Sequence, residues 1–340
     1  MQRKAPAGPE RPLLLVLDDA GSPDARRLVE AVGARGSLAV IDRSSLASLE
    51  VGTEGVHVQA CLGDAVIRPG AVLVWRLPQV CDHPRRDELM ANPVAHSFHV
   101  NQWATMLHGL FLAWEFDGVP IVNGADVGRW DEKTAQLIVA ASVGFRTPPT
   151  LRSARPEGIA PFLQAHGGAG ITKAFIPFHD YDAGTKRAVR QLTREVTVED
   201  VEARGEGAIP TAALYQPLVR SRAELRIVVV GDEVFAARFH RDEMDHVDSR
   251  HQEAAVVPAS AYDVPDDLAR RCQALLARCD LDMAVIDVLI DDDGEAVFLD
   301  LNPTGVFDWI ACRFDLPIYP AVGRLLADLA SGTASRRSTT

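Results

Sequence analysis

MAVIDVLIDDDGEAVFLDLNPTGVFDW, residues 283–309, contains two apolar runs, 284–290 and 296–301. Between them lie three aspartates and a glycine, residues 291–294. Two apolar runs joined by a short glycine-containing loop are typical of a β-hairpin. We therefore expect two antiparallel strands in this stretch.

Acidic and amide side chains interrupt both strands of this hairpin. Asp287 lies within the first strand, Asp300 ends the second, and Asn302 follows two residues later. Residues two apart in a strand share a face, and a hairpin can bring Asp287 beside the other two. Three oxygen donors without Cys or His suit a hard cation such as Mg²⁺, which completes its shell with water and phosphate. Either acid alone could cap a strand end in water, but the set, with the Pro303–Gly305 turn, indicates a metal–nucleotide site.

Composition bounds the class of protein. The chain has 340 residues, of which 47% are apolar and 24% charged, as in globular proteins with two or three subdomains. Its formal net charge of −12 is a poor match for nucleic acid or an anionic membrane, although local basic pockets are compatible with it. No apolar run reaches the roughly 18–20 residues of a membrane span, and the run 13–17 is too short for a secretion signal. We therefore expect a cytoplasmic protein with no nucleic-acid or membrane partner.

Cysteine and histidine spacing gives no sign of a structural metal site. The three histidines at 240, 246 and 251 do not share a helical face. The cysteines are scattered, without the C-x-x-C spacing of a zinc knuckle or the pattern of a disulfide framework. They are Cys61, Cys81, Cys272, Cys279 and Cys312. Incidental reduced thiols are the favoured interpretation.

Strands and helices alternate in the first third of the chain. Apolar runs at 13–17, 38–41 and 72–76 predict strands, and the run from Asp24 to Gly36 predicts a helix. This alternation indicates an α/β layer with a largely parallel sheet. The first turn has a single glycine, Gly21, and therefore no dinucleotide fingerprint. A long helix at 99–116 follows, with an aromatic stripe that we expect in the core: Trp103, Leu107, Leu110, Phe111 and Trp114.

Two lysines and a polar loop in the rest of the chain are candidates for binding an anion. Lys173 lies in a predicted strand, 171–175, where a buried lysine requires an anion. Lys133 lies on a predicted helix, and taken alone it is better interpreted as a solvated surface residue. The polar loop 176–190 could cover phosphates with backbone N–H groups, or could be an ordinary surface loop.

A second hairpin and two helices complete the expected elements. Strands at 225–230 and 234–239 contain or adjoin Arg226 and Arg238, which need partners there. The remaining segments comprise a strand at 213–219 and helices at 130–143, 157–166, 266–279 and 320–329.

This order of features resembles the ATP-grasp superfamily over residues 120–325. More narrowly, it resembles the ATP-grasp ligases that macrocyclise ribosomally made peptides, the microviridin or graspetide maturases. The similarity is carried by DEKTAQLIVAASVGFRTPPTL from Asp131, LYQPLVRSRAELRIVVVGDEVFAA from Leu214, the Asp248–Arg250 triplet and FLDLNPTGVFDWI from Phe298. Trp75, Arg76 and the segment WEFDGVPIVN also resemble that family's N-terminal domain.

The resemblance implies a mixed α/β (α+β) architecture. An N-terminal pre-ATP-grasp domain would span 12–125, a central or lid subdomain 126–215, and a C-terminal subdomain with the metal site 216–330. The tails 1–11 and 331–340 are expected to be disordered.

The resemblance also implies cofactor-binding roles. Lys133 and Lys173 would contact the phosphates of ATP, and Gln216 with the backbone near Leu218 would face the adenine. The metal-binding set would hold two Mg²⁺, with Mn²⁺ as the alternative ion, and consists of Asp287, Asp300 and Asn302.

Three residues are implied as catalytic. Arg226 and Arg250 would lie near the transferred phosphate, and Asp248 belongs to the same family-like triplet as Arg250. Phosphoryl transfer depends on charge neutralisation and positioning more than on covalent help, which agrees with this set.

The chain departs from the family pattern at three places. Asp300 stands where relatives usually carry Glu, and Pro217 stands where many carry Glu beside the adenine. The closing segment reads NPTGVFDW where relatives often show NPNGQW. These differences leave the triphosphate-binding groups in place but leave the identity of the substrate open.

The implied reaction is activation of a carboxylate as an acyl phosphate, followed by attack of a hydroxyl or amine and release of ADP and phosphate. The expected substrate is a ribosomally made precursor peptide. Alternatives are a free amino acid or other small carboxylate, and a non-catalytic nucleotide-binding protein. Because many relatives are dimers, the resemblance also implies that this chain could form a homodimer.

Overall fold

A computed structural model describes residues 13–17, 22–33, 36–46, 48–54, 57–74, 92–175, 179–182, 187–190, 193–203, 211–240 and 258–333. The predictions for Trp75, Arg76, Asp248 and Arg250 lie outside these residues. Contacts divide the chain into two compact units. Unit 1 contains residues 1–127, 280–283 and 317–340, and unit 2 contains residues 128–279 and 284–316.

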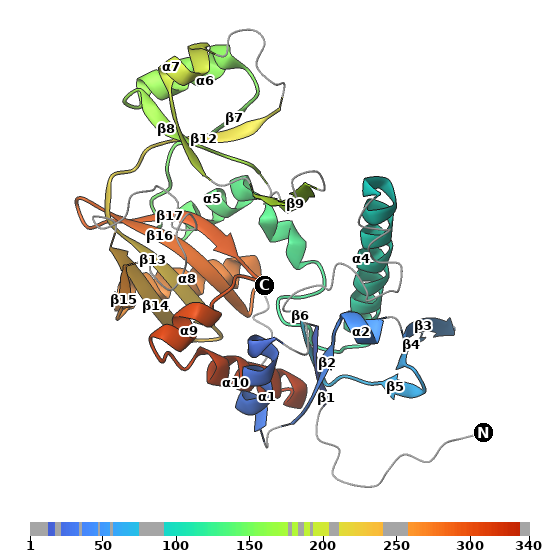
Figure 1. Cartoon of the computed structure of the whole chain (residues 1–340). Coiled ribbons are helices and arrows are strands. Elements are labelled where there is room, and N and C mark those ends of the chain that lie inside the picture. The colour runs from blue at the N-terminus through green and yellow to red at the C-terminus, as the bar shows by residue number, and fades with distance from the viewer. Residues whose placement is uncertain are drawn as a thin grey trace. The chain divides into compact units, whose positions relative to one another are not determined.

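A parallel sheet forms the centre of unit 1 (Figure 1). Strand β1 (Leu13–Leu17) lies between β2 (Ser37–Ile41) and β6 (Ala71–Val74), and both pair with it in parallel. Helix α1 (Pro23–Val32) connects the first two strands. It begins after Ser22, whose Oγ accepts a hydrogen bond from the N–H of Ala25 at 3.0 Å. The predicted α/β layer is confirmed here.

Three strands after α1 and β2 form an antiparallel sheet that the sequence pattern did not predict. The strands are β3 (Leu49–Glu54), β4 (His57–Leu62) and β5 (Ala65–Ile67), and the short helix α2 (Arg43–Leu46) precedes them. After α4, the chain returns to the parallel sheet through one parallel bridge between Ile121 and Val72.

Helix α4 (Pro93–Phe116) begins six residues earlier than predicted. Asn92 explains this start, because its Oδ1 accepts hydrogen bonds from the N–H groups of Val94 and Ala95, each at 3.1 Å. The predicted stripe lies in the hydrophobic core of unit 1. Leu107, Leu110, Phe111 and Trp114 are buried there, with Trp103 packed against the cluster.

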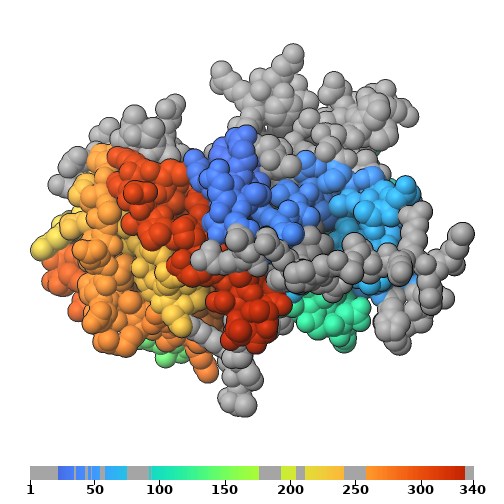
Figure 2. Space-filling view, turned by 90° about the horizontal axis from the view of Figure 1, so that it is seen from below, coloured from blue at the N-terminus to red at the C-terminus, as the bar shows by residue number. Residues whose placement is uncertain are grey.

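The C-terminal helix α10 (Ile318–Ser331) packs against α1 in unit 1. Tyr319 donates a hydrogen bond to Asp24 Oδ1 at 2.5 Å, and both side chains are buried. A Cβ at Gly323 would lie 3.0 Å from the carbonyl oxygen of Ala31, so glycine permits this close approach. In Figure 2 the blue N-terminal and red C-terminal residues meet on one face. The three-part division expected from the sequence stays a prediction.

Unit 2 contains an antiparallel sheet of four strands in the described part of the chain, which we call the lid sheet. Its order is β11 (Arg194–Thr197), β8 (Ala169–Lys173), β12 (Ala213–Pro217) and β7 (Leu151–Ser153). Helices α6 (Pro156–Ala165) and α7 (Val198–Ala203) pack against it around Leu163, Val201 and Tyr215. Within the predicted loop 176–190, β9 (His179–Asp182) and β10 (Arg187–Arg190) pair as an antiparallel hairpin.

A larger sheet, which we call the acid sheet, contains the two predicted hairpins of unit 2. Its described strands follow the order β15 (Ala259–Ala261), β14 (Glu233–His240), β13 (Ser221–Val230), β16 (Met283–Asp291) and β17 (Ala296–Asn302). The associated helices are α5 (Lys133–Ser142), α8 (Asp266–Cys279), the short α9 (Asp308–Arg313) and the 3₁₀ helix η2 (Val127–Asp131). Both hairpins are confirmed.

The described cysteines are free. Burial raises the pKa of Cys272 and of Cys279 to about 12, so both thiols are protonated and inert at neutral pH. Among the described residues, no helix has the length and apolarity required to cross a membrane.

Candidate functional site

Strands β16 and β17 bring the three predicted metal ligands together on one face. Asp287 and Asp300 are direct cross-strand partners, and Asn302 pairs with Val285 two residues away. The register shifts just beyond Asp287, where β17 has one extra residue, Leu299. The bulge therefore lies immediately beside the two carboxylates.

Lys133 meets this acid pair from the first turn of α5. Its Nζ forms an ion pair with Oδ1 of Asp300, and its side chain is only 14% exposed. The exposure excludes the alternative of a solvated surface lysine. A predicted phosphate-binding residue and a predicted metal ligand are thus neighbours.

Arg226 approaches the same face from β13. Its Nη1 donates to both carboxylate oxygens of Asp287, at 3.0 and 3.2 Å. Its Nε and Nη2 donate to the carbonyl oxygen of Val306, at 3.2 and 2.8 Å. Arg226 therefore joins a predicted metal ligand to the loop after the Asn302 turn. Arg238, which was also expected to need a partner, has a buried Nε without a hydrogen-bond partner among the described residues.

Asp131 is a residue of this site that the sequence analysis missed. Burial raises its pKa, the Lys133 ammonium lowers it and the Asp300 carboxylate raises it, and the resulting pKa lies above the ordinary value. Lys133 thus lies within electrostatic range of two carboxylates. The signal available in the sequence was the acidic pair directly before Lys133.

Gln136 is a second residue that the sequence analysis missed. It is 1% exposed, and its side chain hydrogen-bonds to the backbone of Leu301, the residue between Asp300 and Asn302. No local pattern marks this contact, because the two residues lie 165 positions apart.

The lid sheet holds the predicted nucleotide-binding residues Lys173 and Gln216, and Leu218 follows directly after β12. Lys173 ends β8 and pairs with Leu214 of β12. Gln216 is 1% exposed and donates from Nε2 to Thr150 Oγ1 at 2.9 Å, while its Oε1 has no partner among the described residues. Leu218 is exposed, and its N–H donates to the carbonyl oxygen of Ala169 at 3.4 Å.

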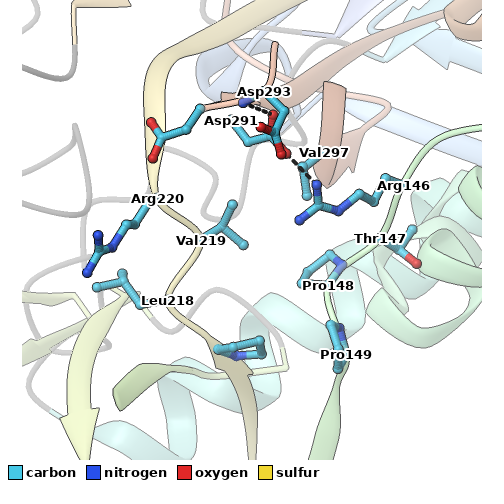
Figure 3. Close-up of a pocket in the computed structure, with 12 residues that line it drawn as sticks. Arg146, Thr147, Pro148, Pro149, Leu218, Val219, Arg220, Asp291, Asp293 and Val297 are labelled. Carbon is cyan, nitrogen blue, oxygen red and sulfur yellow. Dashed lines mark hydrogen bonds and ion pairs between the residues drawn. The ribbon is translucent and has the colours of Figure 1, made fainter. Parts of the chain in front are cut away.

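A pocket of about 290 Å³ lies where the chain enters and leaves the lid sheet (Figure 3). The entering segment contributes residues 146–149, the leaving segment residues 217–220, and the β16–β17 turn residues 291–293. Leu218 lines this pocket, but the acid pair and Lys133 do not. Leu218 and the residues around Asp300 therefore do not line this pocket together.

Asp291 anchors the entering segment to the β16–β17 turn (Figure 3). Its Oδ1 accepts hydrogen bonds from the N–H groups of Asp293 and Glu295, at 3.0 and 2.8 Å, and its Oδ2 pairs with Arg146. Burial pushes the pKa of Asp291 upward, but the two N–H groups and the Arg146 guanidinium outweigh it and hold the pKa below its ordinary value.

We expect Asp291→Ala to lower the free energy of unfolding by roughly 1–3 kcal/mol at pH 7, because two backbone donors lose their acceptor. Asp291→Asn keeps an acceptor oxygen and loses only the pair with Arg146, which is 56% exposed, so its cost should stay below about 1 kcal/mol. Because the folded-state pKa is depressed, the difference between wild type and Asn should shrink as pH falls through the Asp range. Urea unfolding from pH 7 to pH 3 measures both. An Asn cost that grows on acidification would contradict the assignment.

Gly305 closes the turn that carries Asn302. The N–H of Gly305 donates to the carbonyl oxygen of Asn302 at 3.1 Å, and Asn302 Oδ1 accepts from the N–H of Thr304 at the same distance. A Cβ at Gly305 would lie 2.5 Å from Val285 Cβ and 2.6 Å from its Cγ2. A side chain there would force the turn away from β16.

We expect Gly305→Ala to cost about 1–3 kcal/mol of unfolding free energy and to displace Asn302. Gly158→Ala in α6 is the matched control, because its Cβ would meet only Ser153 Oγ at 3.8 Å. Thermal unfolding measures both variants. Equal stability of the two variants would show that the turn accommodates a Cβ at position 305, contrary to the close contact with Val285.

Clusters of three or more His, Cys, Asp or Glu side chains suited to a metal ion do not occur among the described residues. The predicted set differs in kind, since it combines two carboxylates with the amide of Asn302. Such oxygen-only sets suit Mg²⁺, which takes few protein ligands.

Comparison with solved structures identifies the fold. No protein-family model matches the sequence, and curated protein sequences give no match either. The chain is similar to the macrocyclase MdnC bound with precursor peptide MdnA from Microcystis aeruginosa, at 21% identity and a TM-score of 0.77, over 93% of this chain and 99% of that one. It is also similar to the ATP-grasp ligase PsnB complexed with a precursor variant, Mg and ADP, at 21% identity and a TM-score of 0.74, over 93% and 98%.

A third similar structure is D-cycloserine synthetase DcsG, at 18% identity and a TM-score of 0.56, over 94% of this chain and 99% of that one. The chain therefore has the ATP-grasp fold, and the similarity to these structures extends over nearly its whole length. This confirms the predicted fold class.

Proposed function

We propose that this chain is an ATP-dependent ligase that joins a carboxylate to a hydroxyl or amine in a ribosomally made precursor peptide. The proposal is supported by one observation above the others. In an ATP-grasp fold, two carboxylates and two cations face one another on the acid sheet as the pairs Lys133–Asp300 and Arg226–Asp287.

These pairs fit a magnesium nucleotide. Without ligand, each carboxylate is neutralised by its cation. A bound magnesium–ATP complex would supply cations for Asp287 and Asp300 and phosphate oxygens for Lys133 and Arg226, so that none of the four groups would be left unpaired. Asn302 adds a neutral oxygen to the same face. We propose two Mg²⁺, with Mn²⁺ as the alternative.

The nucleotide base would lie against Gln216. Its buried Oε1 lacks a donor among the described residues, and such an acceptor is costly unless a ligand satisfies it. The amino group of adenine is a donor of the required kind. Lys173, at the end of β8, is proposed to contact the phosphates.

The reaction follows from the roles of these groups. ATP supplies a phosphoryl group to the substrate carboxylate, and the hydroxyl or amine then displaces phosphate at the acyl carbon and loses a proton. The side chains position the reactants and neutralise charge, and no nucleophile of the chain is required. Asp248 and Arg250 keep their proposed catalytic roles as predictions.

The substrate class is supported by similarity to structures that are themselves bound to precursor peptides, MdnC and PsnB. A small carboxylate is the second candidate, because the chain also resembles D-cycloserine synthetase. A non-catalytic nucleotide-binding protein is disfavoured, since binding alone would not need the complete set of acids and cations. A homodimer and a cytoplasmic location remain predictions from the sequence.

The test is incubation with Mg²⁺, ATP and a candidate precursor peptide, taken from a neighbouring gene for a short peptide rich in Thr, Ser, Lys, Asp and Glu. ADP formation coupled to loss of one water per ring, read by mass spectrometry, would support the proposal. ADP formation with free amino acids and an unchanged peptide would favour the small-molecule reaction. ATP binding without turnover in every mixture would favour the non-catalytic protein.

A further inference from the structure

Strand β17 carries two of the three candidate metal ligands, and it lies at the edge of the acid sheet. An edge strand has backbone donors and acceptors with no strand to pair with. On β17 the N–H of Phe298 donates to the carbonyl oxygen of Arg146 at 2.9 Å. The next part of the edge, at Leu301, is paired by a side chain, that of Gln136.

The contact between Gln136 and Leu301 is reciprocal. Gln136 Oε1 accepts from the N–H of Leu301 at 3.1 Å, and Nε2 donates to the carbonyl oxygen of Leu301 at 2.8 Å. The carboxamide thus pairs with this residue as a neighbouring strand would. Leu301 lies between Asp300 and Asn302. Hydrogen bonds to its peptide groups therefore also fix the backbone from which the two flanking side chains project.

The same amide also holds the segment that leads to Lys133. Nε2 donates to the carbonyl oxygen of Trp130 at 2.5 Å, so both amide hydrogens and the oxygen are used. Trp130 is held a second time, because its Nε1 donates to the carbonyl oxygen of Cys279 at 2.8 Å. A rotated amide would place its oxygen against two carbonyls, so the side chain has one orientation.

Resting on the proposed function, we infer that Gln136 is a positioning residue: one buried carboxamide fixes the placement of Lys133 relative to Asp300 and Asn302. It touches neither nucleotide nor metal itself. It acts by tying the start of α5 to the strand that presents the ligands. A surface lysine that merely lies near an acid would not need its position fixed by such hydrogen bonds.

The chemistry of the side chain makes the inference testable. Glutamate at this position keeps an acceptor for the N–H of Leu301 but places a second oxygen against the carbonyls of Leu301 and Trp130. Methionine has a similar volume and removes all three hydrogen bonds. Gln273→Met is the matched control, because its Nε2 donates to the carbonyl oxygen of Asp232 at the β13–β14 turn, away from β17.

Three measurements on the full chain distinguish positioning from simple stabilisation. Hydrogen exchange read by mass spectrometry reports the Leu301 amide, calorimetry reports binding of ADP across a Mg²⁺ titration, and steady-state assays separate kcat from KM. For Gln136→Met and Gln136→Glu we expect magnesium affinity and kcat to fall by roughly 10–100-fold, the range found for residues that orient metal ligands. Exchange at Leu301 should quicken in Gln136→Met. The Gln273 variant should match wild type in all three.

The outcomes separate this inference from the proposed function. If wild type binds magnesium–ADP and the Gln136 variants bind and turn over with unchanged magnesium dependence, the inference is wrong and the function stands. If the variants only melt earlier, while the folded protein keeps its kcat, the role is structural and the inference is again overturned. If wild type binds no nucleotide, the proposed function fails, and with it the role of Gln136 toward the metal. Should Gln136→Met fold poorly, Gln136→Glu supplies the same comparison.

Discussion

Replacing Asp300 with asparagine is expected to abolish ligation while the fold stays intact. The substitution keeps the shape of the side chain and removes the charge that pairs with Lys133 and, as proposed, binds magnesium. Residues that merely orient metal ligands contribute roughly 10–100-fold to affinity or activity, so loss of a ligand should exceed that range. Asn302→Ala should act in the same direction.

Stability should change little in Asp300→Asn, for a reason visible in the register. Asp287 and Asp300 are directly opposite each other, and like charges in that position are destabilising. Removing one carboxylate relieves this repulsion, which raises stability, and breaks the ion pair with Lys133, which lowers it. The two effects should largely offset each other. The free energy of unfolding should therefore stay within about 1 kcal/mol of wild type.

Two further variants make the test of Asp300 specific. Asp292→Asn removes an acid from the nearby turn, where the side chain is 61% exposed and 3.9 Å from Arg222, and should leave activity unchanged. Asp300→Glu lengthens the side chain by one methylene and should retain turnover, because it keeps the carboxylate oxygen donor that magnesium prefers. ADP release and calorimetric binding of magnesium–ADP are the measurements. Full ATP-dependent activity in Asp300→Asn would remove Asp300 from the metal site.

The local part of this site could be predicted from the sequence. The hairpin, its turn and the shared face of Asp300 and Asn302 follow from apolar runs and strand periodicity, which depend on neighbouring residues. The helix at 266–279 was predicted for the same reason, since its buried residues recur at helical spacing.

The long-range part could not be predicted. The pairing of Lys133 with Asp300 joins positions 167 apart, and that of Tyr319 with Asp24 joins positions 295 apart. Packing, not periodicity, sets such contacts, which is why neither the role of Gln136 nor the contact between α10 and α1 could be predicted. The helix α9 has only six residues, too few to show a helical pattern. In the β3–β5 sheet, strands such as LEVGTE alternate too weakly to signal a buried face.

Replacing Arg226 with methionine is the second change for which we expect a large effect. It removes four hydrogen bonds, two to the carboxylate of Asp287 and two to the carbonyl oxygen of Val306. Arg226 and Asp287 are only 20% and 23% exposed, so water replaces these contacts poorly. Hydrogen bonds to charged groups contribute roughly 1.5–3 kcal/mol, and we expect a loss of stability in this range.

Turnover should fall more steeply than stability in Arg226→Met. The guanidinium is proposed to move from Asp287 to the phosphate, and removing one donor to a developing charge costs about 10²–10³-fold in kcat. Arg226→Lys separates charge from geometry. An ammonium retains the positive charge but cannot bridge a carboxylate and a carbonyl as the planar guanidinium does, so it should recover part of the stability and little of kcat.

A double-mutant cycle with Asp287→Asn decides between these roles of Arg226. In unfolding without ligand, the two substitutions should be non-additive, because each removes the same ion pair. The kcat of each single variant should be close to zero, since one variant would lack a phosphate contact and the other a metal ligand. Additive effects on unfolding would show that the pair contributes nothing to the ligand-free state. An Arg226→Met variant with wild-type kcat would mean that Arg226 holds Asp287 and the Val306 loop in place without acting on the phosphate.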